Sequence, residues 1–285
     1  MEYVNGLDAD LDDTFKAFCA GFSDYIIKFS ISKEDFISRF FGPEGNSLEL
    51  TYVALDDKKP VGVILGGIKE FDGIKTLRCG ALAVHPEYRG KGISQKLFNL
   101  HKEQGLLNGC KQLFLEVIVG NDRAINFYKK HGYEKIYDIS YFKLEDITKI
   151  KDYNNTYESL VKRISFDEFE VFYRQIKGVH VNWQNDIDYI KKSSNNMFYG
   201  TYFGKENKLI GVLCINNYGK VSYIWVEKEN RNNGIASSML KAAVNELNLS
   251  KIFFSFPNNC LLENFVKKKG FTRDKISQYE MYLIV

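Results

Sequence analysis

The sequence predicts an α/β protein of two tandem domains of one kind, each a mixed, twisted sheet flanked by helices. At 285 residues, the chain is near the upper limit for a single core. The same order of strands and helices also occurs twice along the chain. The central strands are almost wholly apolar, as strands covered on both faces are. We place the domains at residues 1–148 and 156–285, with the charged, Asn-rich stretch 144–158 as their junction.

The elements of the two copies follow from apolar periodicity and helix-end signals. Asn121 and Asn259 are predicted N-caps, and Gly132 and Gly270 are predicted to follow the ends of the same helices. The first copy has predicted strands at 53–55, 61–68, 76–84, 111–119 and 138–144, and the second repeats the order over 200–215, 220–226, 251–256 and 277–285.

Composition narrows the class of protein. A hydrophobic fraction of 45% indicates a globular chain, and the formal charge of +3 is too balanced to indicate a nucleic-acid partner. The five cysteines are scattered and without a C-x-x-C pair, which disfavours a disulfide framework or a zinc site. No apolar run reaches the roughly 20 residues of a membrane span, and no signal peptide follows Met1. We expect a cytoplasmic protein without membrane, nucleic-acid or metal partners.

Two short stretches, "YRGKGIS" at 88–94 and "NRNNGIA" at 230–236, each join a strand to a helix. Backbone N–H groups at such a turn are unsatisfied, and the helix dipole adds positive charge, so the turn is suited to an anion. Glycine lets phosphate approach the backbone, and the arginine would add charge-assisted bonds. The alternative is a plain turn with a surface arginine. The residues that repeat are Arg89, Gly92 and Ser94 in the first stretch, and Arg231, Gly234 and Ala236 in the second.

Neither turn fits two common phosphate-binding patterns. A Walker A loop is absent, and "GKGISQ" lacks the third glycine of the dinucleotide fingerprint. The remaining pattern is R-x-x-G-x-[G/A]. With this pattern and this order of elements, the sequence resembles the GNAT superfamily of acyl-CoA-dependent N-acetyltransferases, most strongly over 76–135 and 220–272. Ser94 departs mildly from that pattern, whereas Ala236 fits it.

The resemblance implies acetyl-CoA (coenzyme A) as cofactor. In that family, the strand end before the turn offers backbone groups to the pantetheine arm, and the turn holds the pyrophosphate. Carried over, the cofactor-binding residues are Leu82, Ala83, Val84, Arg89, Gly90, Lys91, Gly92, Ile93, Ser94, Asn121 and Tyr128. A second cofactor site would comprise Arg231, Asn233, Gly234 and Ala236.

Acetyl transfer to an amine needs a base for the ammonium and an acid for the departing thiolate. Glu116 is the single charge on the strand "LFLEVIV", where burial would raise its pKa toward that of a useful base. The alternative is a cleft-edge carboxylate paired with lysine or arginine. Tyr128, in "NFYKKHGY", stands where the family has its acid, although a tyrosine on an amphipathic helix is usually core. Glu116 and Tyr128 are therefore the predicted catalytic residues.

The second copy lacks both proton-handling groups. Aligned on Asn259, Phe254 replaces Glu116 and Val266 replaces Tyr128. We therefore predict that the N-terminal domain is catalytic and that the C-terminal domain is degenerate.

The sequence says less about the acceptor than about the cofactor. Asp24 and Tyr25 fall where acceptor-binding helices lie in this family, so they are weak substrate-site candidates, although an ordinary amphipathic helix explains them equally well. His101, on a helix, is expected to be solvated. The resemblance implies acetyl transfer to a primary amine of a small-molecule or peptide acceptor by a monomer or homodimer. Two alternatives stay open: a non-catalytic acyl-CoA-binding or sensing protein, and a tandem acyltransferase for a larger acceptor such as a thiol precursor or peptide.

Overall fold

The computed structural model describes residues 1–28, 30–151, 160–205 and 207–285, and these form two compact units. The first unit comprises Met1–Tyr137 with Gln278–Val285, and the second comprises Asp138–Ser277. Residues 152–158 of the predicted junction lie outside the described residues. No helix in the described ranges is long and apolar enough to cross a bilayer.

The first unit is a mixed sheet with helices on both faces, in the strand order β1-β2-β3-β4-β5-β12. The β4–β5 pair is parallel, and the other described pairs are antiparallel. Its strands are β1 (Glu2–Asn5), β2 (Ser47–Asp56), β3 (Lys59–Phe71), β4 (Ile74–Val84), β5 (Gln112–Ile118) and part of β12 (Thr272–Ile284). Its helices are α1 (Leu11–Gly21), α2 (Lys33–Phe40), α3 (Ile93–Leu107) and α4 (Asp122–Lys130).

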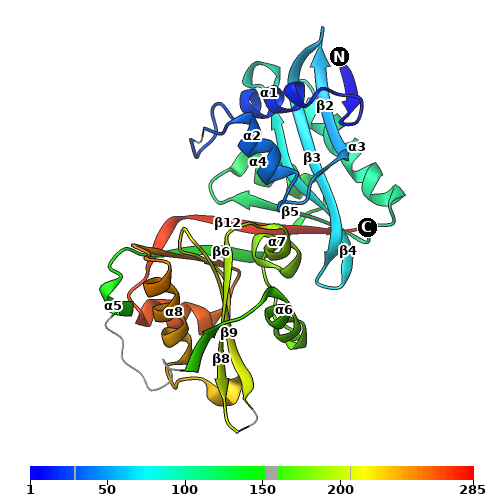
Figure 1. The fold of residues 1–285 in the computed structure, drawn as a ribbon. Coiled ribbons are helices and arrows are strands. Elements are labelled where there is room, and N and C mark those ends of the chain that lie inside the picture. Colours follow the sequence, from blue (N-terminus) through cyan, green and yellow to red (C-terminus); the bar gives the residue numbers. More distant parts are fainter. Residues whose placement is uncertain (29, 152–159, 206) are drawn as a thin grey trace. The chain divides into compact units, whose positions relative to one another are not determined.

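Each face of this sheet has its own core. Helices α1 and α2 bury Phe18 and Phe36 on Val63 and Leu65 of β3, whereas α3 and α4 pack on the opposite face. Figure 1 shows α1 and α2 on one side of the sheet and α3 on the other. Consecutive residues along β4, and likewise along β5, therefore point to different helix layers, because side chains alternate along a strand.

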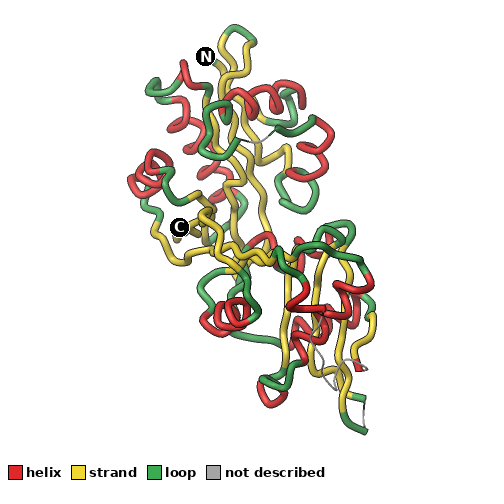
Figure 2. Tube along the Cα trace, turned by 90° about the vertical axis from the view of Figure 1, so that its left-hand side faces the viewer, coloured by secondary structure: helices red, strands yellow, loops and turns green. Residues whose placement is uncertain are grey.

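The second unit repeats this plan in the order β6-β11-β10-β9-β8-β7, with a parallel β10–β11 pair. Its strands are β6 (Glu134–Leu144), β7 (Val161–Arg163), β8 (Asn196–Phe203), β9 (Lys208–Asn216), β10 (Lys220–Val226) and β11 (Ile252–Phe256). Its helices are α5 (Thr148–Lys151), α6 (Phe166–Gln175), α7 (Ile187–Lys192), α8 (Ile235–Glu246) and α9 (Cys260–Lys268). Figure 2 shows helices flanking the strands in each unit.

The last strands of the two units are exchanged. Residues 278–284 of β12 pair with β5 in the first unit, and residues 140–144 of β6 pair with β11 in the second. This partition differs from the predicted boundaries at 148 and 156, which kept each closing strand with its own half of the chain. Both strands bury similar faces, so the sequence pattern does not reveal which sheet each one joins.

The predicted helix ends are confirmed. The Asn121 side chain accepts from the Ala124 amide at 3.3 Å, and the Asn259 side chain accepts from the Leu262 amide at 3.0 Å. Gly132 and Gly270 follow the last helical turns with φ of 88° and 83°. A left-handed residue here favours glycine because a Cβ would clash with the backbone.

His101 is fully buried, so the expectation that it would be solvated was wrong. It shares the inward face of α3 with Leu97, four residues earlier, and its Nδ1 would lie 3.0 Å from a Cβ added at Gly66. Neither ring nitrogen has a hydrogen-bond partner among the described residues. Burial lowers the pKa of His101 to about 3.

We expect His101→Leu to remove an acid sensitivity of folding. In the folded unit the ring stays neutral, whereas the unfolded chain takes up a proton below about pH 6.5, so stability is lost as pH falls. From about pH 6 to pH 4, this group lowers the free energy of unfolding by about 1.4 kcal/mol per pH unit. Denaturant unfolding at several pH values measures the slope. His101→Gln, polar but not titratable, is the control, and equal slopes in all three proteins would contradict the prediction.

Candidate functional site

The parallel strands β4 and β5 separate partway along their length. Their described ladder ends with Cys79 opposite Leu115, although β4 continues to Val84 and β5 to Ile118. Beyond Cys79, β4 stays paired with β3 through Leu82, Ala83 and Val84. The opening between β4 after Cys79 and β5 after Leu115 is called the wedge below. Backbone groups along its β4 edge can pair with an extended, amide-bearing chain as if it were an added strand. The structure thus places the three predicted strand-end residues along this wedge.

The turn after β4 ends in a helix that begins without a side-chain cap. Gly90 and Gly92 have φ of 76° and 80°, and a Cβ at either would meet nothing within 4 Å. Gly92 caps α3 with no side-chain hydrogen bond, as Gly234 does for α8. The helices α1, α2, α4, α6 and α9 each have a side-chain cap instead. The first amides of α3 therefore have no side-chain cap, and free amides at a helix N-terminus are the groups that bind anions in proteins.

The Arg89 side chain holds this turn against the end of β4 and the end of α1 by hydrogen bonds. Its Nε donates to the Val84 carbonyl at 3.0 Å and its Nη2 donates to the Gly21 carbonyl at 3.1 Å. The Arg231 Nε likewise donates to the Val226 carbonyl at 2.9 Å. The repeated arginine thus fastens the turn to the preceding strand end. The guanidinium that the sequence predicts as an additional anion contact is thus engaged with backbone carbonyls in both turns.

Asp24 and Tyr25 lie just beyond α1, which ends at Gly21, so they are not on the helix that the sequence suggested. The Asp24 carboxylate accepts from Arg89 Nη2 at 2.7 Å, and this arginine lowers its pKa. Burial raises the pKa of the Tyr25 hydroxyl, which a hydrogen bond with Asn121 partly offsets. This segment therefore touches both predicted cofactor elements, the turn and the start of α4.

The hydroxyl of Tyr128 lies where the two strands begin to separate. Its Oη is 4.0 Å from the Sγ of Cys79, the last paired residue of β4. Tyr128 is buried in the core shared with α3, and burial raises its pKa well above the usual value. The hydroxyl therefore keeps its proton at neutral pH. The structure brings this predicted acid to the narrow end of the wedge.

Glu116, the first β5 residue past the ladder, is buried in an ion pair. Its Oε2 accepts from Arg78 Nη2 at 2.8 Å, and Arg78 Nη1 donates to Glu44 Oε2 at 2.7 Å. Glu116 thus has the pairing with arginine that the sequence suggested as the alternative for this carboxylate. Sequence reasoning missed Arg78 and Glu44. Arg78 could have been found by the criterion used for Glu116, since it is the only charge in "TLRCGALAV".

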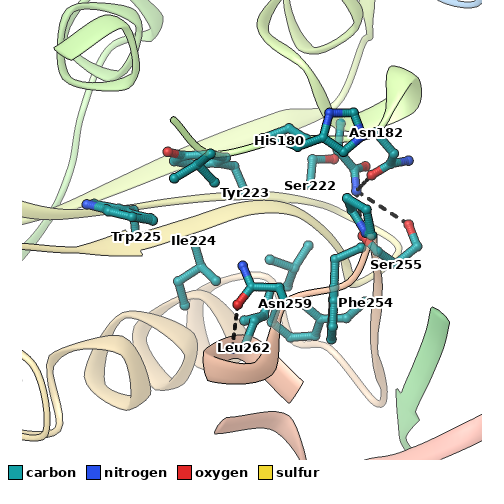
Figure 3. Close-up of a pocket in the computed structure, with 16 residues that line it drawn as sticks. His180, Asn182, Ser222, Tyr223, Ile224, Trp225, Phe254, Ser255, Asn259 and Leu262 are labelled. Carbon is teal, nitrogen blue, oxygen red and sulfur yellow. Dashed lines mark hydrogen bonds between the residues drawn. The ribbon is translucent and has the colours of Figure 1, made fainter. Parts of the chain in front are cut away.

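The second unit has a similar wedge. The β10–β11 ladder ends with Val221 opposite Phe254, although β10 continues to Val226. A pocket opens there, lined by 221–225, by 254–257 and by residues between Val179 and Asn185. Figure 3 shows His180, Asn182 and Ser255 grouped together, with Trp225 farther along the strand. The described residues that line this pocket include no Asp, Glu, Lys or Arg.

Strand register identifies the counterpart of Glu116 in the second unit as Ser255. Leu115 and Phe254 both end a ladder, so the next residues, Glu116 and Ser255, correspond. The assignment of Phe254 to this place was one residue off, because the connection from strand to N-cap is shorter in the second unit. Val266, fully buried, occupies the place of Tyr128 seven residues beyond its N-cap. Neither counterpart carries an ionisable side chain.

The chain resembles known proteins in sequence and in fold. Residues 14–133 match the Acetyltransferase (GNAT) family. N-alpha-acetyltransferase 30 of Saccharomyces cerevisiae is 34% identical over 94 residues, which cover 30% of this chain and 52% of that protein. The chain thus spans about half the length of this curated relative.

Two solved structures share the fold over almost the whole chain. A tandem GNAT protein from the clavulanic acid biosynthesis pathway has a TM-score of 0.72 at 15% identity, covering 99% of this chain and 98% of that one. A GCN5-related N-acetyltransferase from Sphaerobacter thermophilus has a TM-score of 0.65 at 12% identity, covering 99% and 95%. The family match spans most of the first unit, and the tandem fold extends from end to end. Most of the first unit, residues 14–133, therefore matches the GNAT acetyltransferase family, and the whole chain has the fold of a solved tandem GNAT protein.

Proposed function

We propose that the protein transfers an acetyl group from acetyl-CoA to a primary amine, with the chemistry in the first unit. The observation that carries the proposal is the Tyr128 hydroxyl at the narrow end of the β4–β5 wedge, 4.0 Å from Cys79. The wedge leads from there to an uncapped helix N-terminus. A thioester carrier with a long amide-bearing arm and a diphosphate fits these two features together.

The residues of the first unit fit coenzyme A. Backbone groups of Leu82, Ala83 and Val84 would pair with the pantetheine amides, and amides between Gly90 and Ser94 would hold the diphosphate. When bound, acetyl-CoA supplies the activated acetyl group. Lys91 lies in the same turn, and Asn121 opens the neighbouring helix.

Two side chains would handle protons. Tyr128 would donate its proton to the departing thiolate, and burial favours the protonated hydroxyl. Glu116, on the opposite face of the sheet, would accept a proton from the ammonium directly or through water. An attacking amine therefore approaches from the α1–α2 face. Asp24 and Tyr25 border that approach and are proposed to contact the acceptor or the bound cofactor.

The second unit would bind coenzyme A without turning it over. It keeps the wedge, Arg231 on the Val226 carbonyl and an uncapped Gly234 with φ of 83°. Asn233 and Ala236 complete this second proposed cofactor site. With Ser255 and Val266 in place of Glu116 and Tyr128, it has neither proton acceptor nor donor at those positions.

Gly92→Val and Gly234→Val test the two cofactor sites separately. A β-branched residue is strained at positive φ, and its side chain would cover the amides that face the diphosphate. We expect two acetyl-CoA molecules per chain in the unaltered protein by native mass spectrometry, and one in each variant. Gly92→Val should weaken first-site binding at least tenfold and abolish turnover, whereas Gly234→Val should keep turnover. Gly109→Val, at an exposed turn with φ of 69°, is the control for strain alone. Loss of turnover in Gly234→Val but not in Gly92→Val would reverse the assignment.

The acceptor is sought with a panel of small amines and of peptides with a free N-terminus, with thiol release from acetyl-CoA as the measured signal. The peptides are included because a curated relative is named as an N-alpha-acetyltransferase. Amine-dependent thiol release supports the transferase. Tight acetyl-CoA binding with no release across the panel favours the sensing alternative, and release with peptides or thiol precursors alone favours the larger acceptor.

A further inference from the structure

A buried chain of charges crosses the first unit on the face away from Tyr128. The Arg78 guanidinium lies between two carboxylates, with Nη1 at 2.7 Å from Glu44 Oε2 and Nη2 at 2.8 Å from Glu116 Oε2. Side-chain exposures are 7% for Arg78, 3% for Glu44 and 2% for Glu116. Separate nitrogens of one planar fork thus hold two carboxylates that come from different parts of the chain.

The placement of Arg78 links the paired and separated parts of the two strands. Arg78 is in register with Phe114, one residue before the ladder ends, whereas Glu116 is the first β5 residue beyond it. The guanidinium therefore reaches forward from the fixed ladder to the residue at the opening of the wedge. At that position the β5 backbone is paired with β12 but not with β4, and side-chain contacts decide where the carboxylate oxygens of Glu116 point.

The other end of the guanidinium holds the segment after α2. Arg78 Nη1 also donates to the Glu44 carbonyl at 3.3 Å, so both backbone and side chain of Glu44 are fixed. This segment connects α2 to β2 on the face from which the proposed acceptor approaches. One side chain, Arg78, therefore contacts both the Glu116 carboxylate and the acceptor-side segment.

The C-terminal strand completes the surroundings of Glu116. In the antiparallel β5–β12 register Glu280 lies directly opposite Glu116, and it is fully buried. The Tyr282 hydroxyl donates to Glu280 at 3.2 Å, and burial raises the pKa of Tyr282. Among the described residues, the charged and titratable groups near this face of Glu116 include Glu44, Arg78, Glu280 and Tyr282, with Asp72 and Tyr137 beside the last two.

We infer that Arg78 is a positioning residue that holds the Glu116 carboxylate, in its ionised form, toward the acceptor side of the wedge. The inference rests on the proposed function, in which Glu116 accepts the proton of the amine. A base contributes only when its oxygen is within hydrogen-bond reach of that proton, directly or through one water, so a loosened carboxylate lowers turnover without weakening cofactor binding.

Arg78→Met removes both the fork and its charge. We expect kcat with the best amine of the panel to fall at least tenfold, while KM for acetyl-CoA stays within twofold. The acidic limb of the kcat/KM profile should move up by about one pH unit or more, because the carboxylate loses the cation that favours its ionised form. Arg78→Lys should bring the limb back toward its original position while kcat stays low, because the ammonium restores charge but not the planar fork.

The matched control is Arg39→Met. Arg39 also pairs with Glu44, from the solvent side at 3.5 Å, and its side chain is 61% exposed. This variant should leave kcat and the pH profile unchanged. If Arg78→Met does not fold, Glu44→Gln makes the same test with the opposite sign. Removal of the second carboxylate should move the acidic limb to lower pH.

The two proposals fail in distinguishable ways. Full turnover in Glu116→Gln would overturn the base role and this inference with it. An inactive Glu116→Gln, together with a folded Arg78→Met or Glu44→Gln that keeps the original kcat and pH profile, would overturn the positioning role alone and leave Arg78 as a structural bridge.

Discussion

Tyr128→Phe should lower kcat about 100-fold and leave the Kd for acetyl-CoA within twofold of the unaltered protein. General acids of this kind contribute roughly 10²- to 10⁴-fold, because the thiolate otherwise departs without a proton. We expect the ring to stay in place, because the hydrogen-bond contact of the deleted hydroxyl among the described residues is the long one with Cys79 at 4.0 Å. Steady-state thiol release measures the rate, and isothermal titration calorimetry measures the affinity.

Tyr133→Phe is the matched control for this change. Its hydroxyl is also buried, and its ring centroid lies 5.7 Å from that of Tyr128. A general effect of deleting a buried hydroxyl near the wedge would appear in both variants, whereas acid catalysis predicts near-normal turnover for Tyr133→Phe. Equal rates for Tyr128→Phe and the unaltered protein would show that another group protonates the thiolate.

Deletion of residues 278–285 should unfold the first unit and spare the second. These residues form the strand beside β5, in register from Gln278 opposite Ile118 to Ile284 opposite Gln112. Met281 is fully buried in the core shared with α3 and α4. Loss of one such side chain costs about 2–5 kcal/mol, against a total stability of about 5–15 kcal/mol for a domain. Loss of the whole strand exceeds what the unit can tolerate.

Hydrogen exchange resolves the two units in this test. Peptides from β4 and β5 should exchange at the rate of an unfolded chain in the deletion variant, while peptides from β9 and β10 should keep their protection. Met281→Ala provides a graded version, with a loss of about 2–5 kcal/mol confined to the first unit. Deletion of Val285 alone is the control. Unchanged protection in β5 after the full deletion would mean that the exchanged strand is dispensable.

Features set by neighbouring residues were predicted from the sequence. The Asn121 and Asn259 caps, the glycines after the same helices and the two arginine–glycine turns depend on contacts within about five residues, so residue type and spacing suffice. The repeat of these signals led to the tandem fold, which the comparisons confirm, and to the resemblance to a family whose model matches residues 14–133. Glu116 was found because it is the single charge on an otherwise apolar strand, and Tyr128 because it stands where the family that the sequence resembles has its acid.

Only the tertiary structure decided which of these residues meet. Arg78 and Glu116 are 38 residues apart, and Asp24 and Arg89 are 65 apart. Pairings over such distances depend on how strands and helices pack. The burial of His101 and the correspondence of Ser255 with Glu116 likewise needed the packing of α3 and the register of β11.

The exchanged strands show this division most clearly. Alternating apolar residues in β6 and β12 determine that each strand has buried faces, and this was evident from the sequence. The pattern is equally compatible with either sheet, because a buried face specifies an environment and not a partner. The choice of sheet is made by the register of β12 on β5 and of β6 on β11, and it places Glu280 of the C-terminal strand opposite Glu116 of the first unit.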